Sequence, residues 1–174
     1  SGIAIIASLF YGTWFIFTGN FTLAVLSFSL AASMIAFFRF NVFSKKNKIF
    51  LGDAGAMITG LIISVLTIQF LEFENTAPAR FQFNSAPLIA IGLLFIPIFD
   101  SLRVFILRII SGTIFLSGKN HIHHVILDRC KSHLITTLII ISGNIIMLFI
   151  VFVLQRFGSN FLIVLMSSLS VLLF

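Results

Sequence analysis

The sequence predicts an all-α, polytopic integral membrane protein. Of its 174 residues, 59% are hydrophobic and only 9% are charged, and the mean hydropathy is +1.18. A soluble domain of this length carries about a quarter charged residues to cover its surface. Apolar residues also follow one another without a polar face, as in Ala36-Phe37-Phe38, and such a helix lies in lipid or in a large core. A chain this short cannot build several large cores, so lipid is the better interpretation.

Six segments are apolar enough to be membrane helices, although some are short. A bilayer core of roughly 30 Å requires about 20 mostly apolar residues per helix. The expected helices are residues 3–19, 21–38, 54–71, 87–107, 134–154 and 159–174. Two short links (Gly19-Asn20 and 155–158) and three longer polar stretches (39–53, 72–86 and 108–133) separate them. The sequence has no internal repeat and no low-complexity linker, so residues 1–174 are expected to form a single transmembrane domain.

The basic residues predict how these helices are oriented. Nine of the eleven Lys and Arg residues fall within 39–53 and 103–133, and only Arg80 and Arg156 fall on the other side. Six alternating helices place the two basic-rich stretches on one side, which the positive-inside rule makes cytoplasmic, together with the N-terminus. The net charge of +6 is then explained by loops that face anionic lipid, and no nucleic acid is expected.

The first candidate for chemistry is Phe50-Leu51-Gly52-Asp53-Ala54-Gly55, where a cytoplasmic stretch meets a helix. Gly52 and Gly55 allow a positive φ or a close backbone approach to a ligand. Asp53 is expected at a helix N-terminus, where free N–H groups and the helix dipole favour anions. Two interpretations stay open: Asp53 caps a helix beginning near Ala54, or its carboxylate binds Mg²⁺ together with substrate phosphates.

The second candidate is Lys119-Asn120-His121-Ile122-His123-His124, which holds three of the four histidines. The spacing does not match the two-histidine helical zinc motif, so a zinc site is disfavoured. Imidazoles near Lys119, Arg108 and Arg129 suit the binding of a phosphate or pyrophosphate, with proton transfer near neutral pH. A polar turn at the membrane interface is the simpler alternative. The density of polar residues in so apolar a chain favours a functional site.

The third candidate is Asp100, in the string Pro97-Ile98-Phe99-Asp100 that precedes Arg103. An Asp at the centre of a membrane helix costs about 2.5–3.5 kcal/mol on insertion scales, so it is usually paired or functional. Arg103 lies on the same helix face, which leaves open an ion pair or a direct role in the site. We expect Asp100 and Arg103 to contact the substrate-binding residues and hold them in place, without touching the substrate themselves. Pro97 is expected to loosen the helix just before Asp100.

Taken in order, these motifs resemble the polyprenyl-phosphate N-acetylhexosamine-1-phosphate transferases. That superfamily includes the undecaprenyl-phosphate GlcNAc-1-phosphate transferases and the phospho-MurNAc-pentapeptide transferases. The matching strings are Arg39-Phe40-Asn41 with residues 48–55, residues 97–100 with Arg103, and His121-Ile122-His123-His124. The form of the histidine string is closer to the GlcNAc-1-phosphate branch.

The resemblance covers only part of a family member. Members have about ten or eleven helices, and their earlier loops carry a paired-aspartate motif and an Asp-Gly-Leu motif that do not occur here. We therefore expect this chain to be the C-terminal part of a larger enzyme. The sequence differs from the family at Gly118-Lys119, where members often have Asp-Arg. The resemblance therefore supports a phosphate contact by Lys119 less directly than it supports the other contacts.

The resemblance implies transfer of a HexNAc-1-phosphate, here GlcNAc-1-phosphate, from a UDP-sugar to a polyprenyl phosphate, with release of UMP at the cytoplasmic face of the cell (inner) membrane. It implies Mg²⁺ as cofactor, with Mn²⁺ as a substitute. The expected partners are a UDP-N-acetylhexosamine, a polyprenyl phosphate and the lipid bilayer, and a homodimer is a candidate assembly. The implied catalytic residues are Asp53 (also the metal ligand), His121, His123 and His124, and the implied substrate-binding residues are Gly52, Gly55, Arg108, Lys119 and Asn120.

Two other classes of function remain open. In a transporter or channel subunit, Asp100 and the histidines would form an ion path, with polar residues at mid-bilayer and several discontinuous helices. Here the acidic and histidine residues instead gather at the predicted cytoplasmic boundary. A noncatalytic membrane scaffold is the third class.

Overall fold

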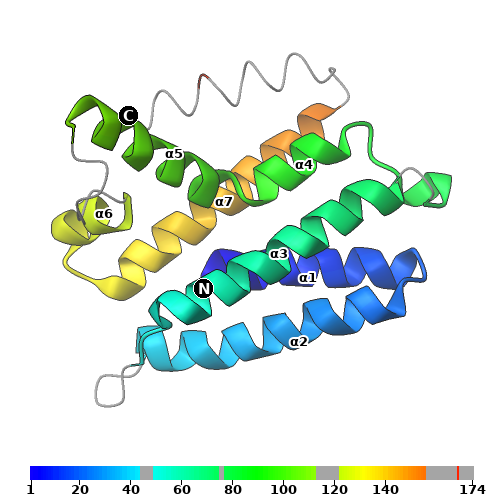
Figure 1. Ribbon diagram of the computed structural model, residues 1–174, viewed down its shortest axis with the longest axis horizontal. Helices are drawn as coiled ribbons and strands as arrows, with labels where there is room; N and C mark the ends of the chain where they lie inside the picture. The colour runs from blue at the N-terminus through cyan, green and yellow to red at the C-terminus, as the bar shows by residue number, and fades with distance from the viewer. Residues whose placement is uncertain (44–48, 75–76, 113–121, 156–167, 169–174) are drawn as a thin grey trace. The chain divides into compact units, whose positions relative to one another are not determined.

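The computed structural model describes residues 1–43, 49–74, 77–112, 122–155 and 168 (Figure 1). All regular elements in these ranges are helices, which confirms the all-α fold class. The chain divides into two compact units, Ser1–Ala90 and Ile91–Phe174, which are described separately below.

The first unit is a helical bundle whose expected segments are confirmed within a few residues. Its elements are α1 (Gly2–Phe17), α2 (Phe21–Phe38), the π-helical turn η1 (Arg39–Phe43), α3 (Gly52–Glu74), the 3₁₀ turn η2 (Ala79–Phe81) and the start of α4 (Ala86–Leu93).

The link between α1 and α2 is a tight Schellman turn. Gly19 has φ +83°, a left-handed conformation that glycine adopts without steric cost. The Asn20 N–H donates to the Phe15 carbonyl at 2.8 Å, and the Gly19 N–H donates to the Ile16 carbonyl at 3.1 Å. These two bonds satisfy carbonyls that the helix end leaves free, so the chain reverses within two residues.

Aromatic side chains hold α1 against α3 at the end of the unit remote from Asp53. Trp14 and Phe70 meet edge to face, with ring centroids 4.8 Å apart, and the Tyr11 hydroxyl hydrogen-bonds Thr67 Oγ1 at 2.8 Å. The Trp14 indole N–H donates to the Phe81 carbonyl at 3.2 Å. Each buried polar tip therefore has a partner, as a low-dielectric interior requires.

The second unit contains the rest of α4, α5 (Phe95–Ile110), α6 (Ile122–Cys130) and α7 (His133–Leu154). The prediction of one continuous helix over 87–107 is wrong, because the segment breaks at Leu94 and its two halves are bent by 56°. Pro97 provides the physical reason. It has no N–H, so the Leu93 carbonyl loses the partner it would have in a continuous helix.

Asn144 of α7 repairs the backbone at this break. Its Nδ2 donates to the Leu93 carbonyl at 2.8 Å, and its Oδ1 accepts from the Ile96 N–H at 3.2 Å. Asn144 is 0% exposed. Because an unpaired buried polar group costs about 1–3 kcal/mol, one side chain here offsets two such penalties.

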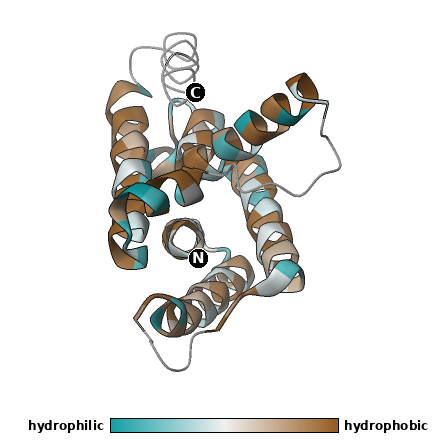
Figure 2. Cartoon of the chain, turned by 90° about the vertical axis from the view of Figure 1, so that its left-hand side faces the viewer, coloured by the Kyte–Doolittle hydropathy of each residue, from teal (hydrophilic) through white to brown (hydrophobic). Residues whose placement is uncertain are grey.

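The described helices fit a membrane protein with several spans. Three are long and apolar enough to cross a bilayer, Phe21–Phe43, Gly52–Glu74 and His133–Leu154, and the bent pair Ala79–Leu93 and Phe95–Ile110 adds a fourth if the pair is one broken span. Helix α1 is apolar but shorter, with 16 residues. The expected helix 159–174 falls outside the described residues, apart from Ser168. In Figure 2, hydrophobic residues are spread along the drawn helices, with fewer hydrophilic ones among them.

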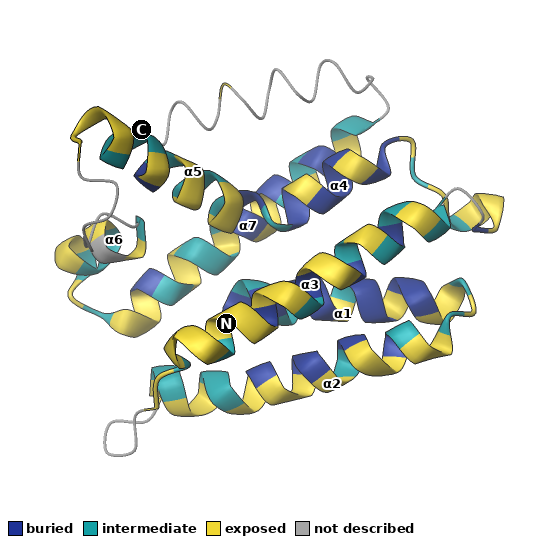
Figure 3. Ribbon diagram, viewed as in Figure 1, coloured by how far each residue is buried: buried dark blue, intermediate teal, exposed yellow. Residues whose placement is uncertain are grey.

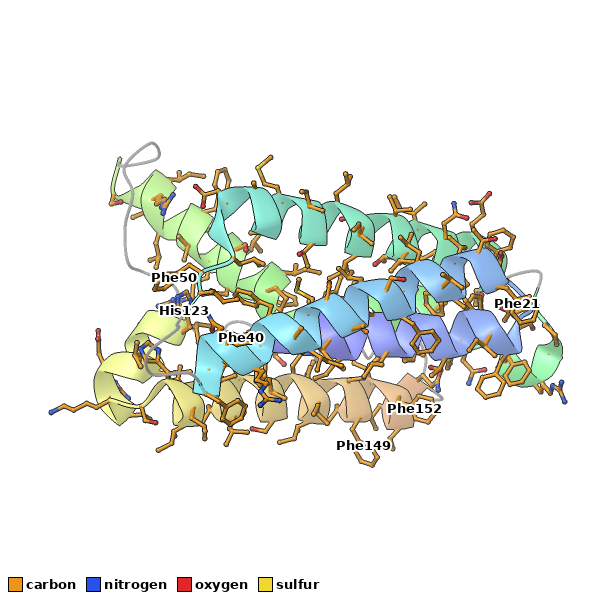
Figure 4. The ribbon with its side chains drawn as sticks, turned by 90° about the horizontal axis from the view of Figure 1, so that it is seen from below. Phe21, Phe40, Phe50, His123, Phe149 and Phe152 are labelled. Carbon is orange, nitrogen blue, oxygen red and sulfur yellow. The ribbon has the colours of Figure 1, made fainter. Side chains whose placement is uncertain are left out.

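Burial follows one side of the longer helices α2, α3 and α7. Helix α2 buries Ala24, Ser27, Leu30, Ala31 and Met34, and Figure 3 shows exposed residues along its opposite side. Large apolar side chains lie in the open: Phe21 is 68% exposed and Phe149 is 66% exposed. Figure 4 shows Phe149 and Phe152 pointing away from α7. Exposing such side chains to water would cost roughly 1.5–3 kcal/mol each, so these surfaces suit lipid or further helices.

Candidate functional site

The Gly-Asp-Ala-Gly string lies at the N-terminus of α3, in the first unit. Gly52 opens the helix with φ +67°, and Asp53 follows in the first turn with an exposed side chain. The carboxylate therefore lies at the positive end of the helix dipole. Helix α3 begins at Gly52, close to the expected start near Ala54, and Asp53 lies in its first turn.

Asn41 connects the two ends of the stretch that leads to Asp53. Its Nδ2 donates to the Ile49 carbonyl at 3.0 Å, which ties η1 to the residues just before Gly52. Gly55 fits closely against Leu51, since a Cβ on Gly55 would lie 3.0 Å from the Leu51 side chain. The start of α3 is therefore held by a hydrogen bond on one side and close packing on the other.

An apolar groove of about 340 Å³ lies between α2 and α3 next to this helix start. Leu51 and Gly55, which flank Asp53 in sequence, form part of its wall. Two hydroxyls in the lining bond to their own helices: Ser33 Oγ donates to the Leu30 carbonyl and Thr59 Oγ1 to the Gly55 carbonyl. The groove therefore offers mainly hydrocarbon contact.

In the second unit, the structure brings the Asp100 string and the histidine string together. Asp100 Oδ1 accepts from the Ile122 backbone N–H at 2.9 Å, across 22 residues of sequence. Ile122 is the first residue of α6, so the carboxylate pairs one of the N–H groups that a helix start leaves free. Arg103 Nη1 lies 3.9 Å from the same oxygen, and the Arg103 and Asp100 side chains are 16% and 13% exposed.

The remaining candidate residues of the second unit are partly described. His123 is exposed on α6, where Figure 4 labels it, and His124 belongs to the same helix. Arg108 lies in the last turn of α5, and its buried Nε has no hydrogen-bond partner among the described residues. The side chain of His124, and all of Lys119, Asn120 and His121, lie outside the description.

Known proteins show what the chain is similar to. Residues 1–71 match the family described as Glycosyl transferase family 4. Over 115 residues the chain is 32% identical to the decaprenyl-phosphate N-acetylglucosaminephosphotransferase of Mycobacterium leprae, with 63% of this chain and 28% of the relative covered. Over 124 residues it is 32% identical to the "Probable undecaprenyl-phosphate N-acetylglucosaminyl 1-phosphate transferase" of Bacillus subtilis (70% and 32% covered).

A third relative is the undecaprenyl-phosphate alpha-N-acetylglucosaminyl 1-phosphate transferase of Salmonella typhi, 26% identical over 114 residues (64% and 29% covered). The resemblance to the polyprenyl-phosphate N-acetylhexosamine-1-phosphate transferases is confirmed. The matched region spans about a third of the length of these relatives. Among solved structures, none matches the chain.

The metal ion implied by the transferase resemblance would meet one carboxylate, that of Asp53, at the start of α3. The part of the chain that the structure describes has no group of three or more His, Cys, Asp or Glu side chains able to hold a metal ion. Asp53 is exposed at a helix start, and Mg²⁺ is commonly bound through one or two carboxylates plus substrate phosphates. Asp53 therefore fits the ion as one ligand.

Two features of this region were missed by reading the sequence. Residues 122–130 were expected only as part of a polar stretch, but they form α6, whose nine residues are too few for the hydrophobic pattern to stand out. Asn144 was not singled out, although a lone amide inside the apolar segment 134–154 is a usable signal. Polar side chains inside a membrane helix usually have a partner or a function.

Proposed function

We propose that the protein transfers a HexNAc-1-phosphate from a UDP-sugar to a polyprenyl phosphate at the cytoplasmic face of the cell membrane. The names of its relatives favour GlcNAc-1-phosphate as the transferred group. The observation that carries the proposal is the similarity to three transferases whose names specify N-acetylglucosamine phosphate and a polyprenyl phosphate. Asp53 lies within residues 1–71, the part that matches the family.

In the proposed reaction, an oxygen of the lipid phosphate attacks the phosphorus that carries the sugar. A new P–O bond forms, the P–O bond to the UMP phosphate breaks, and UMP leaves with the electron pair. Both reactants are anions, so catalysis consists of positioning and of neutralising charge. A bound Mg²⁺ would supply positive charge for the phosphate oxygens.

The chain's own residues suit these tasks. Asp53 would hold the metal ion at the start of α3, where it is exposed and accessible to a substrate. Arg108 has a buried Nε without a described partner, and a guanidinium N–H can donate to a phosphate oxygen. His123, exposed on α6, can bind a phosphate or move a proton near neutral pH.

The groove between α2 and α3 suits the hydrocarbon tail of the lipid acceptor. Its wall continues to Leu51 and Gly55, on either side of Asp53, so a tail in the groove would bring its phosphate toward the carboxylate that holds the ion. Within the bilayer a lipid tail leaves other lipid and not water, so van der Waals packing against the groove wall is what would hold it there.

Membranes containing the full-length gene product provide the direct test. With polyprenyl phosphate and UDP-GlcNAc labelled in the sugar, we expect label in the organic-solvent phase and one UMP released per labelled lipid. Chelating divalent cations should stop the reaction, and Mg²⁺ or Mn²⁺ should restore it. Folded protein that gives no labelled lipid with either cation would contradict the proposal.

The Asp53→Asn variant tests the proposed metal ligand. We expect at least a hundredfold loss of Mg²⁺-dependent UMP release at unchanged expression, because an amide is a poor substitute for a carboxylate ligand of Mg²⁺. Glu72→Gln, an exposed carboxylate near the other end of α3, is the matched control and should retain activity. Near-normal turnover by Asp53→Asn would remove Asp53 from the catalytic centre.

One observation favours the transporter alternative, but the contacts at the helix break do not support it. A broken span is a feature of transporters, and the α4–α5 pair is broken. The polar group at the break is the Asn144 amide, whose two ends are bonded to the Leu93 carbonyl and the Ile96 N–H. An amide engaged in this way repairs the backbone and offers no ion path.

A further inference from the structure

We infer that Asn144 is a positioning residue for the transfer reaction: its amide maintains the break between α4 and α5, and the break sets where α5 presents Asp100 to the start of α6. The inference rests on the proposed function, because positioning has meaning only for a reaction. It concerns contacts of α7 with the break itself, residues 93–96.

The geometry of the break matches the two ends of the Asn144 side chain. In a continuous helix the Leu93 carbonyl would accept from residue 97, and the Ile96 N–H would donate to residue 92. Pro97 rules out the first bond, and the turn at Leu94 (φ −109°, ψ 22°) interrupts the helix. The Leu93 carbonyl accepts a hydrogen bond from Asn144 Nδ2 at 2.8 Å instead, and the Ile96 N–H donates to Asn144 Oδ1 at 3.2 Å.

The surroundings fix α7 at this point. A Cβ on Gly92 would lie 3.1 Å from Val151 Cγ2, and a Cβ on Gly143 would lie 3.4 Å from Ile96 Cδ1. Asn144 and Val151 are both 0% exposed. Small residues on both sides therefore allow the close approach that the two hydrogen bonds require.

From the break, α5 leads directly to the proposed site. Asp100 is six residues after Leu94, on the helix that begins at the break, and its Oδ1 accepts from the Ile122 N–H at 2.9 Å. Ile122 is followed immediately by His123 and His124 on α6. A change in the direction of α5 would move Asp100 and break this bond, so the start of the histidine-bearing helix would lose its anchor.

Pro97 allows the positioning role to be separated from a role in stability alone. Asn144→Leu keeps the side chain near its size but leaves the Leu93 carbonyl and the Ile96 N–H without the partners described above. Adding Pro97→Ala restores an N–H at position 97, so α4 and α5 can join as one helix and satisfy both groups internally. In the double variant, the backbone groups at the former break should all be hydrogen-bonded, and α4 and α5 should form one straight helix. Ser142→Ala, an exposed position on α7, is the matched control.

The experiment measures the thermal midpoint in detergent, and kcat and KM for GlcNAc-1-phosphate transfer per folded molecule, in the full-length gene product. We expect Asn144→Leu to lower the midpoint by several degrees. The double variant should regain most of that loss and yet retain at least a tenfold lower kcat, with KM for the UDP-sugar changed less. Ser142→Ala should match the unmodified protein in both readouts.

Two outcomes would overturn the inference. If the double variant recovers both stability and kcat, Asn144 is structural only. If Pro97→Ala fails to recover the stability lost in Asn144→Leu, then Asn144 does not replace the helical hydrogen bonds that are missing at the break. Absence of transfer by the unmodified protein would instead contradict the proposed function, and the thermal midpoints would still test whether Asn144 repairs the break.

Discussion

At the scale of single residues, the best-supported contact in the candidate site is the one that Asp100 makes with α6. Its Oδ1 accepts the Ile122 N–H and lies 3.9 Å from Arg103 Nη1. The carboxylate thus carries an ion pair and a hydrogen bond from a helix N-terminus. A charge-assisted bond of this kind contributes about 1.5–3 kcal/mol, and the helix dipole adds to it.

Two substitutions at Asp100 separate these contributions. Asp100→Asn retains an oxygen that can accept the Ile122 N–H but loses the charge, so we expect a moderate fall in transfer activity. Asp100→Leu loses both, so we expect a fall of about tenfold or more, in line with the energy of the bond. Asp128→Asn, an exposed carboxylate on α6, should leave turnover unchanged. Normal turnover by Asp100→Leu would show that the bond does not contribute to the site.

At the scale of elements, glycines at two kinds of position should respond oppositely to the same substitution. Gly19→Ala forces a left-handed φ of +83° on an L-residue in the turn between α1 and α2, which costs roughly 1–2 kcal/mol. Gly60→Ala lies inside α3 with no atom within 4 Å of the added Cβ, and alanine is favoured there by roughly 0.5–1 kcal/mol. Thermal midpoints in detergent should fall for the first variant and rise or stay level for the second. A loss of stability in both variants would mean that the left-handed φ of Gly19 is not the cause of the loss in Gly19→Ala.

The elements also show how far the sequence predicts this fold. Segments 21–38 and 134–154 agree with α2 and α7 within one residue, because uniform apolarity and short polar links define membrane helices well. The break at Leu94 was not predicted, since apolarity continues across it and Pro97 alone indicates only a weakening. Its position depends on a tertiary contact with Asn144, which lies 48 residues beyond Ile96.

The candidate site was predictable in composition but not in its contacts. The Asp53, Asp100 and histidine strings stand out because polar residues are rare in this chain. The ion pair between Asp100 and Arg103 follows from their spacing on one helix, and the structure shows it. The bond from Ile122 to Asp100 could not be read from the sequence, because it requires α6 to begin at Ile122 and to lie beside α5.

At the scale of the whole molecule, the distribution of charge predicts which ends of the helices face the cytoplasm. Nine of eleven basic residues lie in two stretches that alternating helices place on one side. Moving a Lys-rich loop across the membrane works against both the surface potential and the transmembrane potential. We therefore expect the stretch before α3, which leads to Asp53, to be cytoplasmic and η2 (Ala79–Phe81) to face the opposite side.

Labelling of single cysteines tests this orientation without altering the charges that produce it. In a Cys130→Ser background, Ser44→Cys reports on the basic stretch and Ala79→Cys on η2, where Ala79 is exposed. A membrane-impermeant maleimide should label Ala79→Cys in intact cells and should label Ser44→Cys only after the membrane is permeabilised. The reverse pattern would place Asp53 on the face opposite the cytoplasm, which would contradict the proposed transfer at the cytoplasmic face. Labelling of both positions in intact cells would mean that α3 does not span the bilayer, which would contradict the assignment of Gly52–Glu74 as a membrane span.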